Sequence, residues 1–214
     1  MKNTSDYMQN TTNFAAAPSG ISASTVTAFI PKISNEFPVW SEHRMQTERL
    51  NLRPVTESDF IEYIELLSDP AVMRFIGSEA GVIPSFEEIA KLHRGAIQAW
   101  KTRGYGRWSM FDRETGEFVG FCGFRSEQGI PELLCAIHEK FWNKGIAEEA
   151  ARECLKYGFE VFGFNHVKAF TRPQHARARR VLEKLMGEYL GKVDYHGVEG
   201  AAYLLKPNIY EILN

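Results

Sequence analysis

The stretch of this sequence with the clearest chemical potential is a short loop that opens a helix, within residues 139–150. Its centre reads Trp142-Asn143-Lys144-Gly145-Ile146-Ala147. The first backbone N–H groups of a helix have no partner inside the helix and carry a partial positive charge, which suits a pyrophosphate. Gly145 and the small Ala147 would let phosphate oxygens approach the backbone, and Lys144 adds a positive charge. An ordinary turn that uses glycine for an unusual dihedral angle is the alternative.

Two other phosphate-binding loops fit this stretch poorly. A Rossmann loop requires G-x-G-x-x-G directly after the first strand of a parallel unit. Here the pattern is Gly145-x-Ala147-x-x-Ala150, and it follows an expected antiparallel meander. A P-loop is excluded because the sequence contains no G-K-[ST].

Metal, disulfide, nucleic-acid and membrane functions are not indicated. The three cysteines contain no C-x-x-C pair and the six histidines show no metal-ligand spacing, so we expect no metal site and a reducing cytoplasm. The formal net charge of -2 supplies no bulk positive field for nucleic acid or an anionic membrane. No run of 18 apolar residues occurs, so we expect no membrane span.

Before the loop, the spacing of apolar residues changes along the chain from the alternation of a strand to the spacing of helices. Leu50 and Leu52 alternate with polar neighbours and predict a first strand. A helix start at 56–59 precedes one apolar face, made by Phe60, Tyr63, Ile64 and Leu67. After the break at Asp69-Pro70, we expect a short helix over 73–76. Ser85 and Glu88 then form a capping box for a longer helix, with an apolar face of Ile89, Leu92, Ala96, Ile97 and Trp100.

Strands predominate after that helix. We expect a meander of strands over 106–111, 118–124 and 133–138, with turn chemistry at 112–116. The helix that begins at Gly145 has an apolar face of Ala147, Ala150, Ala151, Cys154, Leu155, Gly158 and Phe162. A strand over 167–171, a helix over 175–186 and two strands over 189–195 and 200–205 follow. This order predicts one α+β domain over 45–214 with a central, mostly antiparallel mixed sheet flanked by helices.

Residues 1–44 are rich in Ser, Thr, Asn and Ala and lack periodicity, so we expect a flexible N-terminal tail. An apolar stretch over 26–33 could dock on the domain instead.

The loop resembles the acyl-CoA-binding motif of the GNAT superfamily, Q/R-x-x-G-x-G/A, with Gly145 and Ala147 at the small positions. Trp142 stands at the Q/R position, which is typical of a branch that resembles the ribosomal-protein N-terminal acetyltransferases. The loop of that branch usually reads W-G-K-G-Y-A-T-E-A. Thr47–Arg53 is similar to its opening T-E-R-L-x-L-R, and Val181–Leu185 to its R-V-L-E-K-L-G helix. The resemblance spans roughly residues 47–207 and implies the GNAT fold with acetyl-CoA as cosubstrate.

The resemblance also implies a set of cofactor-binding residues. The strand before the loop splays from its neighbour in the family and binds the pantetheine arm through backbone groups, which by position are those of Ala136, Ile137 and His138. The loop residues expected to hold the pyrophosphate are Trp142, Asn143, Lys144, Gly145, Ile146 and Ala147. His175 occupies the place of an Asn that binds the cofactor in relatives and could do so through either ring nitrogen. A solvent-exposed helix start is the alternative for His175.

The expected reaction is direct attack of an amine on the thioester, with Glu132 as candidate base. Strand alternation places Glu132 on one face with Leu134, Ala136 and His138, and the branch often has Glu there. A surface carboxylate at a strand end is the alternative. His138 and Tyr189 are further catalytic candidates. Many relatives place a Tyr general acid where this chain has Leu182, but a thiol with a pKa of about 8.5 leaves readily without assistance.

We expect the acceptor to be the α-amine of a protein or peptide. With a pKa of about 7.7–8.0, roughly a tenth of an α-amine is neutral at pH 7, against under roughly one part in a thousand for lysine. A small amine such as a polyamine, amino acid or antibiotic is the alternative acceptor, and a catalytically silent acyl-CoA sensor or scaffold is the alternative function. Segments 73–84 and 195–200 are the expected acceptor loops, and the pattern leaves monomer and homodimer open.

Overall fold

A computed structural model describes residues 42–77 and 81–207. The predicted tail, including the apolar stretch over 26–33, lies outside the described residues except for its last few positions. The elements of the first half are β1 (Met45–Gln46), β2 (Leu50–Pro54), the 3-10 helix η2 (Glu57–Asp59), α3 (Phe60–Leu67), α4 (Pro70–Met73) and α5 (Phe86–Arg103).

Helix starts in this half follow the capping chemistry of the sequence. Ser85 accepts from the backbone N–H of Glu88 at 3.3 Å, and the Glu88 carboxylate accepts from the Ser85 N–H at 2.7 Å, which confirms the predicted box. The short helix α4 begins at Pro70 and not at residue 73, because the Asp69 carboxylate caps it by accepting from the Ala71 N–H at 2.8 Å.

The second half contains β3 (Arg107–Asp112), β4 (Phe118–Glu127), β5 (Ile130–Ile137), the 3-10 helix η3 (Glu139–Phe141), α6 (Ile146–Glu160), β6 (Val167–Thr171), α7 (Ala176–Lys184), β7 (Glu188–Tyr195) and β8 (Val198–Leu205). Strands β4 and β5 run to a two-residue turn, Gln128-Gly129, whose positive φ angles of 52° and 83° suit a tight hairpin. Both strands are therefore longer than predicted. Helix α6 ends at Glu160, so Phe162 lies beyond it.

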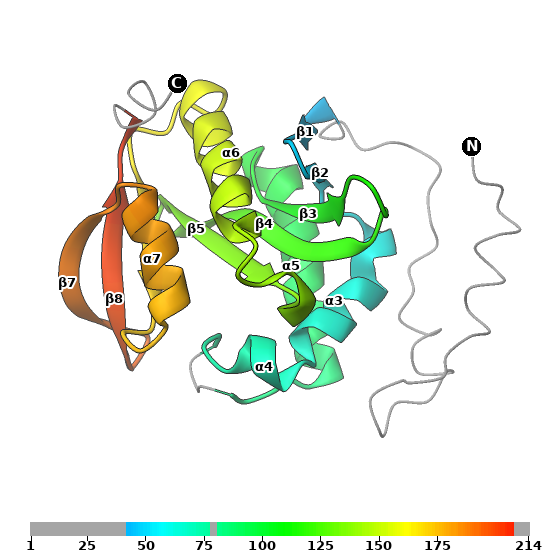
Figure 1. Ribbon diagram of the computed structural model, residues 1–214, viewed down its shortest axis with the longest axis horizontal. Coiled ribbons are helices and arrows are strands. Elements are labelled where there is room, and N and C mark those ends of the chain that lie inside the picture. The colour runs from blue at the N-terminus through cyan, green and yellow to red at the C-terminus, as the bar shows by residue number, and fades with distance from the viewer. Residues whose placement is uncertain (1–41, 78–80, 208–214) are drawn as a thin grey trace, which may run out of the picture. The chain divides into compact units, whose positions relative to one another are not determined.

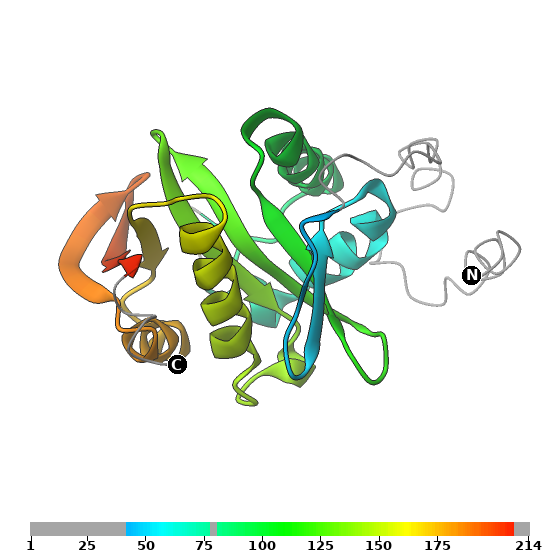
Figure 2. The same cartoon turned by 90° about the horizontal axis from the view of Figure 1, so that it is seen from above.

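The strands form one sheet in the order β1-β2-β3-β4-β5-β6-β8-β7. Every neighbouring pair is antiparallel except β5 and β6, which are parallel. Helices α3 and α5 cover one face of the sheet, and α6 and α7 cover the other (Figures 1 and 2). The predicted α+β class with a mostly antiparallel mixed sheet is confirmed.

Apolar faces seal the sheet on both sides. Trp108 and Phe124 are almost fully buried, and Gly158 of α6 approaches so closely that an added Cβ would lie 2.8 Å from the Phe124 ring. On α5, Ile89, Ala96, Ile97 and Trp100 are buried as predicted. Leu92 is an exception, since 42% of it is exposed and it lines a groove. No helix in the described part of the chain is long and apolar enough to cross a membrane.

The parallel pair β5–β6 separates soon after it forms. Only Glu132↔Lys168 and Leu133↔Ala169 are paired, although β5 continues to Ile137. Within residues 42–77 and 81–207, the last four residues of β5 therefore have no strand neighbour on the β6 side. The loop that leads into α6 follows directly beyond this gap (Figure 1).

Candidate active site

The loop before α6 leaves open space over the first turn of the helix. Gly145 is the helix N-cap at φ +78°, and Asn143 also has a positive φ of 60°. A Cβ added to Gly145 would meet only the Arg49 guanidinium nitrogen Nη2, at 3.4 Å. The space beside the Gly145 Cα is thus open.

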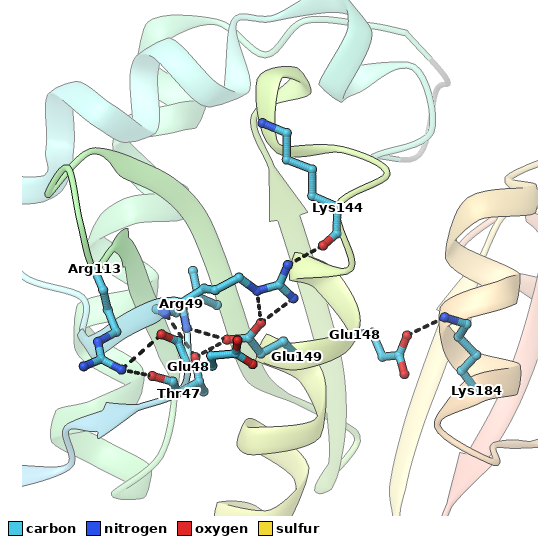
Figure 3. A network of polar contacts seen from close by, with 9 residues as sticks. Thr47, Glu48, Arg49, Arg113, Lys144, Glu148, Glu149 and Lys184 are labelled. Carbon is cyan, nitrogen blue, oxygen red and sulfur yellow. Dashed lines mark hydrogen bonds and ion pairs between the residues drawn. The ribbon is translucent and has the colours of Figure 1, made fainter.

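A clamp from the β1–β2 turn fixes this loop (Figure 3). The Glu149 carboxylate accepts from Thr47 Oγ1 at 2.5 Å and from the Arg49 backbone N–H at 2.9 Å. Arg49 Nε donates to Glu149 Oε2 at 2.6 Å, and its Nη1 donates to the Lys144 carbonyl at 2.5 Å. Partial burial alone would raise the pKa of Glu149, but the hydrogen bonds from Thr47 and Arg49 outweigh it and hold this pKa below its ordinary value. The Thr47–Arg53 motif therefore shapes the loop through Glu149.

Adjacent carboxylates on α6 serve different neighbours. Glu148 points away from the loop and accepts from Lys184 Nζ on α7 at 2.7 Å (Figure 3). Lys144 is exposed, and its ammonium group lies 5.7 Å from the centre of the Phe141 ring. In the described part of the chain Lys144 forms no ion pair, so its charge is available to a ligand.

Trp142 braces the loop against two other elements. Its indole Nε1 donates to the Ile137 carbonyl at 2.8 Å, and the Arg177 guanidinium of α7 lies 3.8 Å from its ring centre. The indole therefore joins the end of β5, the loop and the start of α7.

Backbone groups at the end of β5 divide between its two sides. The His138 N–H donates to the Val119 carbonyl of β4 at 3.0 Å. The Ala136 carbonyl points the same way, since a Cβ on Gly120 of β4 would lie 2.1 Å from it. The Ala136 carbonyl and the His138 N–H thus face β4, while the His138 carbonyl accepts from the Phe141 N–H at 3.0 Å.

Alternation along an antiparallel pair then directs the backbone groups of Cys135 and Ile137 into the gap beside β6. The Ile137 carbonyl already accepts from Trp142, so its N–H and both groups of Cys135 remain on that side. The sequence predicted Ala136, Ile137 and His138 for this edge. Of these three, only Ile137 directs a backbone group into the gap, and Cys135, which the sequence analysis did not name, does so as well.

His175 caps α7 with a half-buried ring, so the solvent-exposed alternative does not hold. The ring stacks on Phe75 at 4.3 Å, and Nδ1 lies 3.4 Å from Thr171 Oγ1. Burial, helped by the nearby Arg177, lowers the pKa of His175 to about 4, so the ring is neutral at pH 7. Its Nε2 is the nitrogen left for a ligand.

Glu132, Arg125 of β4 and Tyr195 of β7 are linked to one another by side-chain hydrogen bonds. The Glu132 side chain is 3% exposed, so it is not the surface carboxylate considered as an alternative. Arg125 donates from Nη2 to Oε1 at 2.8 Å and from Nε to Oε2 at 3.1 Å. The Tyr195 hydroxyl donates to Oε2 at 2.8 Å and itself accepts from Arg125. Burial and the hydrogen bond to Glu132 raise the pKa of Tyr195, which keeps its hydroxyl protonated.

The other two catalytic candidates are not brought to Glu132. His138 follows the opposite end of β5, six residues along the chain, and packs edge-on against Phe118 at 6.0 Å. Tyr189 pairs with Tyr203 and, by strand alternation, lies on the sheet face opposite Glu132. Within the described residues, no cluster of three His, Cys, Asp or Glu side chains could hold a metal ion.

A groove of about 490 Å³ runs between α5 and the sheet, on the same face as Arg125. Its lining residues are Gly77, Pro84, Glu88, Lys91, Leu92, Gly95, Ala96, Ala99, Arg103, Arg107, Phe124 and Arg125. Gly77 and Pro84 belong to the segment expected to contact the acceptor, of which residues 78–80 lie outside the described part. The groove and the gap beside β6 are thus reached from opposite ends of β5.

Residues 49–186 match the family described as the acetyltransferase (GNAT) domain. The protein YkkB of Bacillus subtilis is 31% identical over 153 residues, which cover 68% of this chain and 86% of YkkB. The N-acetyltransferase p20 of Bacillus licheniformis is 28% identical over 164 residues, covering 73% of this chain and 89% of p20. The solved structure of the ribosomal alpha-N-protein acetyltransferase RimL, in complex with coenzyme A, superposes with a TM-score of 0.66 at 17% identity, covering 78% of this chain and 99% of RimL.

Proposed function

Because this chain belongs to the GNAT family and is an acetyl-CoA-dependent N-acetyltransferase, we propose that it acetylates the α-amino group of a protein or peptide. Membership of the family accounts for acetyl transfer from acetyl-CoA, whereas the identity of the acceptor is our proposal. The fold neighbour RimL is by name an alpha-N-protein acetyltransferase, so this fold accommodates such an acceptor. From the odd number of cysteines without C-x-x-C spacing, we propose the cytoplasm as its compartment.

The way Glu132 is held carries the acceptor assignment. A carboxylate offers about four acceptor positions, and three are occupied by Arg125 and Tyr195. One position on Oε1 remains to take a proton, directly or through a water. Such a limited base suits an acceptor that is already partly neutral at pH 7, and an α-amine meets that requirement far better than lysine.

Residues around the gap beside β6 fit acetyl-CoA. The accessible backbone at Gly145, the start of α6 and Lys144 offer groups for a pyrophosphate. The groups of Cys135 and the N–H of Ile137 are directed to where a pantetheine arm would pair as a missing strand. His175 Nε2 flanks the same gap from α7.

Acetyl-CoA supplies a thioester, and the amine nitrogen bonds to its acyl carbon as the carbon–sulfur bond breaks. The Cys135 and Ile137 N–H groups are candidates to stabilise negative charge on the acyl oxygen. Glu132 takes the proton that the attacking nitrogen loses. Leu182, buried where relatives have a tyrosine, cannot protonate the thiolate, which leaves unassisted.

A thiol-release screen tests the proposal. Peptides with a free N-terminus should release CoA thiol and gain one acetyl group on the α-amine, located by mass spectrometry. The same peptides with a blocked N-terminus and one lysine should not react. Acetyl-CoA at a hundredfold excess over its dissociation constant should add about 2.7 kcal/mol of stability, whereas NAD and ATP should add little.

Two results would overturn the proposed acceptor. Faster turnover of polyamines, amino acids or antibiotics than of any peptide would identify a small-amine acetyltransferase. Stabilisation by acetyl-CoA without thiol release from any amine would identify a silent acyl-CoA sensor.

A further inference from the structure

The groove between α5 and the sheet is strongly cationic. Its lining includes four cationic side chains, Lys91, Arg103, Arg107 and Arg125, against the single carboxylate of Glu88. Glu88 is occupied at the N-terminus of α5, where it accepts from the Ser85 N–H. The chain as a whole is slightly acidic, at net charge -2, so this positive charge is a local property of the groove.

Arg107 is the member of this set placed on the groove floor without a polar partner. Its half-buried guanidinium lies over the Phe121 ring at 5.0 Å. In residues 42–77 and 81–207, that guanidinium has no hydrogen bond or ion pair. Burial lowers the pKa of Arg107, because its charge is partly stripped of water and the attraction of the more distant Glu132 offsets this only in part.

Arg125 cannot provide the same free charge. Glu132 engages it through two hydrogen bonds, so its charge is largely compensated. Another unsatisfied donor lies near Arg107, since the buried Tyr63 hydroxyl has no hydrogen-bond partner in the described part and its ring stacks on Phe121 at 5.2 Å. The groove thus presents positive charge that its single lining carboxylate does not balance.

We propose that the acetyl acceptor carries a carboxylate, supplied by an acidic residue at its second or third position, that binds Arg107. This inference rests on the proposed peptide α-amine function. Arg107 pairs with Gly123, which pairs with Leu134 of β5, so Arg107 and Glu132 lie two strand spacings and two residues apart, roughly 12 Å between Cα atoms. Two extended residues cover about 7 Å of that span, and the long Glu and Arg side chains close the rest, so an amine near Glu132 places an early side chain over Arg107. Lys91 and Arg103, exposed at the groove rim, attract the same anion.

Matched acceptor peptides test this inference. Peptides that differ only by Glu or Gln at positions 2 and 3 are compared by kcat/KM in the thiol-release assay. The full chain should favour the Glu peptides by roughly ten- to hundredfold, the range of a hydrogen-bonded charge. Arg107→Gln should abolish this preference while retaining turnover of the Gln peptides, and Arg107→Lys should keep part of it. Arg94→Gln, an exposed charge removal on α5 outside the groove, should keep all of it.

The possible results distinguish a failure of this inference from a failure of the proposed function. Equal rates for Glu and Gln peptides, or an Arg107→Gln variant that keeps the preference, would overturn the inference while leaving the proposed function intact. No acetylation of any peptide would overturn both. If Arg107→Gln fails to fold, the double variant Lys91→Gln/Arg103→Gln at the exposed groove rim is tested instead. It should reduce the preference for Glu peptides several-fold, and added salt should reduce the preference further. Free glutamate reacting faster than the peptides would overturn the peptide as source of the carboxylate.

Discussion

The two ends of β5 are built in different ways. The end that leads into α6 consists of backbone groups and one contiguous loop, held by the clamp from Thr47 and Arg49 to Glu149 and by the Trp142 indole. At the other end, Glu132 is bound by the side chains of Arg125 from β4 and Tyr195 from β7, and Arg125 also lines a groove with side chains from β3 and α5. Backbone donors at a helix start serve any phosphate, whereas a constellation of separate side chains can differ between proteins of one fold. The contrast predicts that the loop before α6 binds the cofactor in the same way throughout the fold, whereas the side chains around Glu132 select the acceptor.

The largest expected effect is at the Glu132 end. Glu132→Gln keeps the shape of the side chain but cannot take a proton, and turnover should fall by roughly two to four orders of magnitude. Affinity for acetyl-CoA should hardly change, because the cofactor groups lie at the other end of β5. Single-turnover kinetics and calorimetric titration separate the two. Glu188→Gln, the same change at an exposed β7 position paired with Lys206, is the control.

The pH profile sharpens the same test. Residual activity of the Gln variant should rise with pH and centre near the pKa of the acceptor amine, about 7.7–8.0 for an α-amine. His175, with its pKa lowered to about 4, is neutral throughout that range and does not contribute. Wild-type turnover in the Gln variant would remove Glu132 from the mechanism and leave water to accept the proton.

The same contrast explains what the sequence could predict. The loop, its helix and the order of strands and helices along the chain follow from local periodicity and capping, and they appear in the structure. The Arg125–Glu132 pair could have been predicted from the sequence, because a two-residue turn at Gln128-Gly129 fixes the hairpin register. The contact with Tyr195 could not, since β7 reaches Glu132 only through tertiary packing. The backbone directions of Ala136 and His138 could not be predicted either, because they depend on the alternation of hydrogen-bonded pairs with β4.

At the cofactor end, Gly145→Val should weaken CoA binding sharply, by roughly ten- to hundredfold. A β-branched residue is strained at φ +78°, and its side chain would occupy the open space above the helix start. Calorimetric titration with CoA measures the loss. Gly145→Asn tolerates the same backbone conformation, so comparing the two variants separates strain from obstruction. Normal binding by the Val variant would place the pyrophosphate elsewhere.

A smaller effect is expected from the clamp. Glu149→Gln removes the charge that holds Arg49 and Thr47, so the loop loses part of its support and CoA binding should weaken about fivefold. The melting temperature should fall by roughly 2–4 °C for each 1 kcal/mol lost. Glu148→Gln, one residue earlier, faces Lys184 and should leave CoA affinity unchanged. Equal CoA affinities in the two variants would mean that the clamp does not support the cofactor loop.

The smallest expected effect belongs to Lys144. Its ammonium group is exposed, so its attraction to a phosphate acts largely through water and Lys144→Ala should weaken CoA binding less than about fivefold. Salt should shrink this difference, because an exposed charge is screened within about 8 Å at physiological ionic strength. Lys140→Ala is a matched control, since both ammonium groups lie over the Phe141 ring but Lys140 is already paired with Glu117 at 3.1 Å. A loss that persists at high salt would mean that Lys144 shapes the loop instead of attracting the phosphate, and an equal loss in both variants would assign the effect to packing on Phe141.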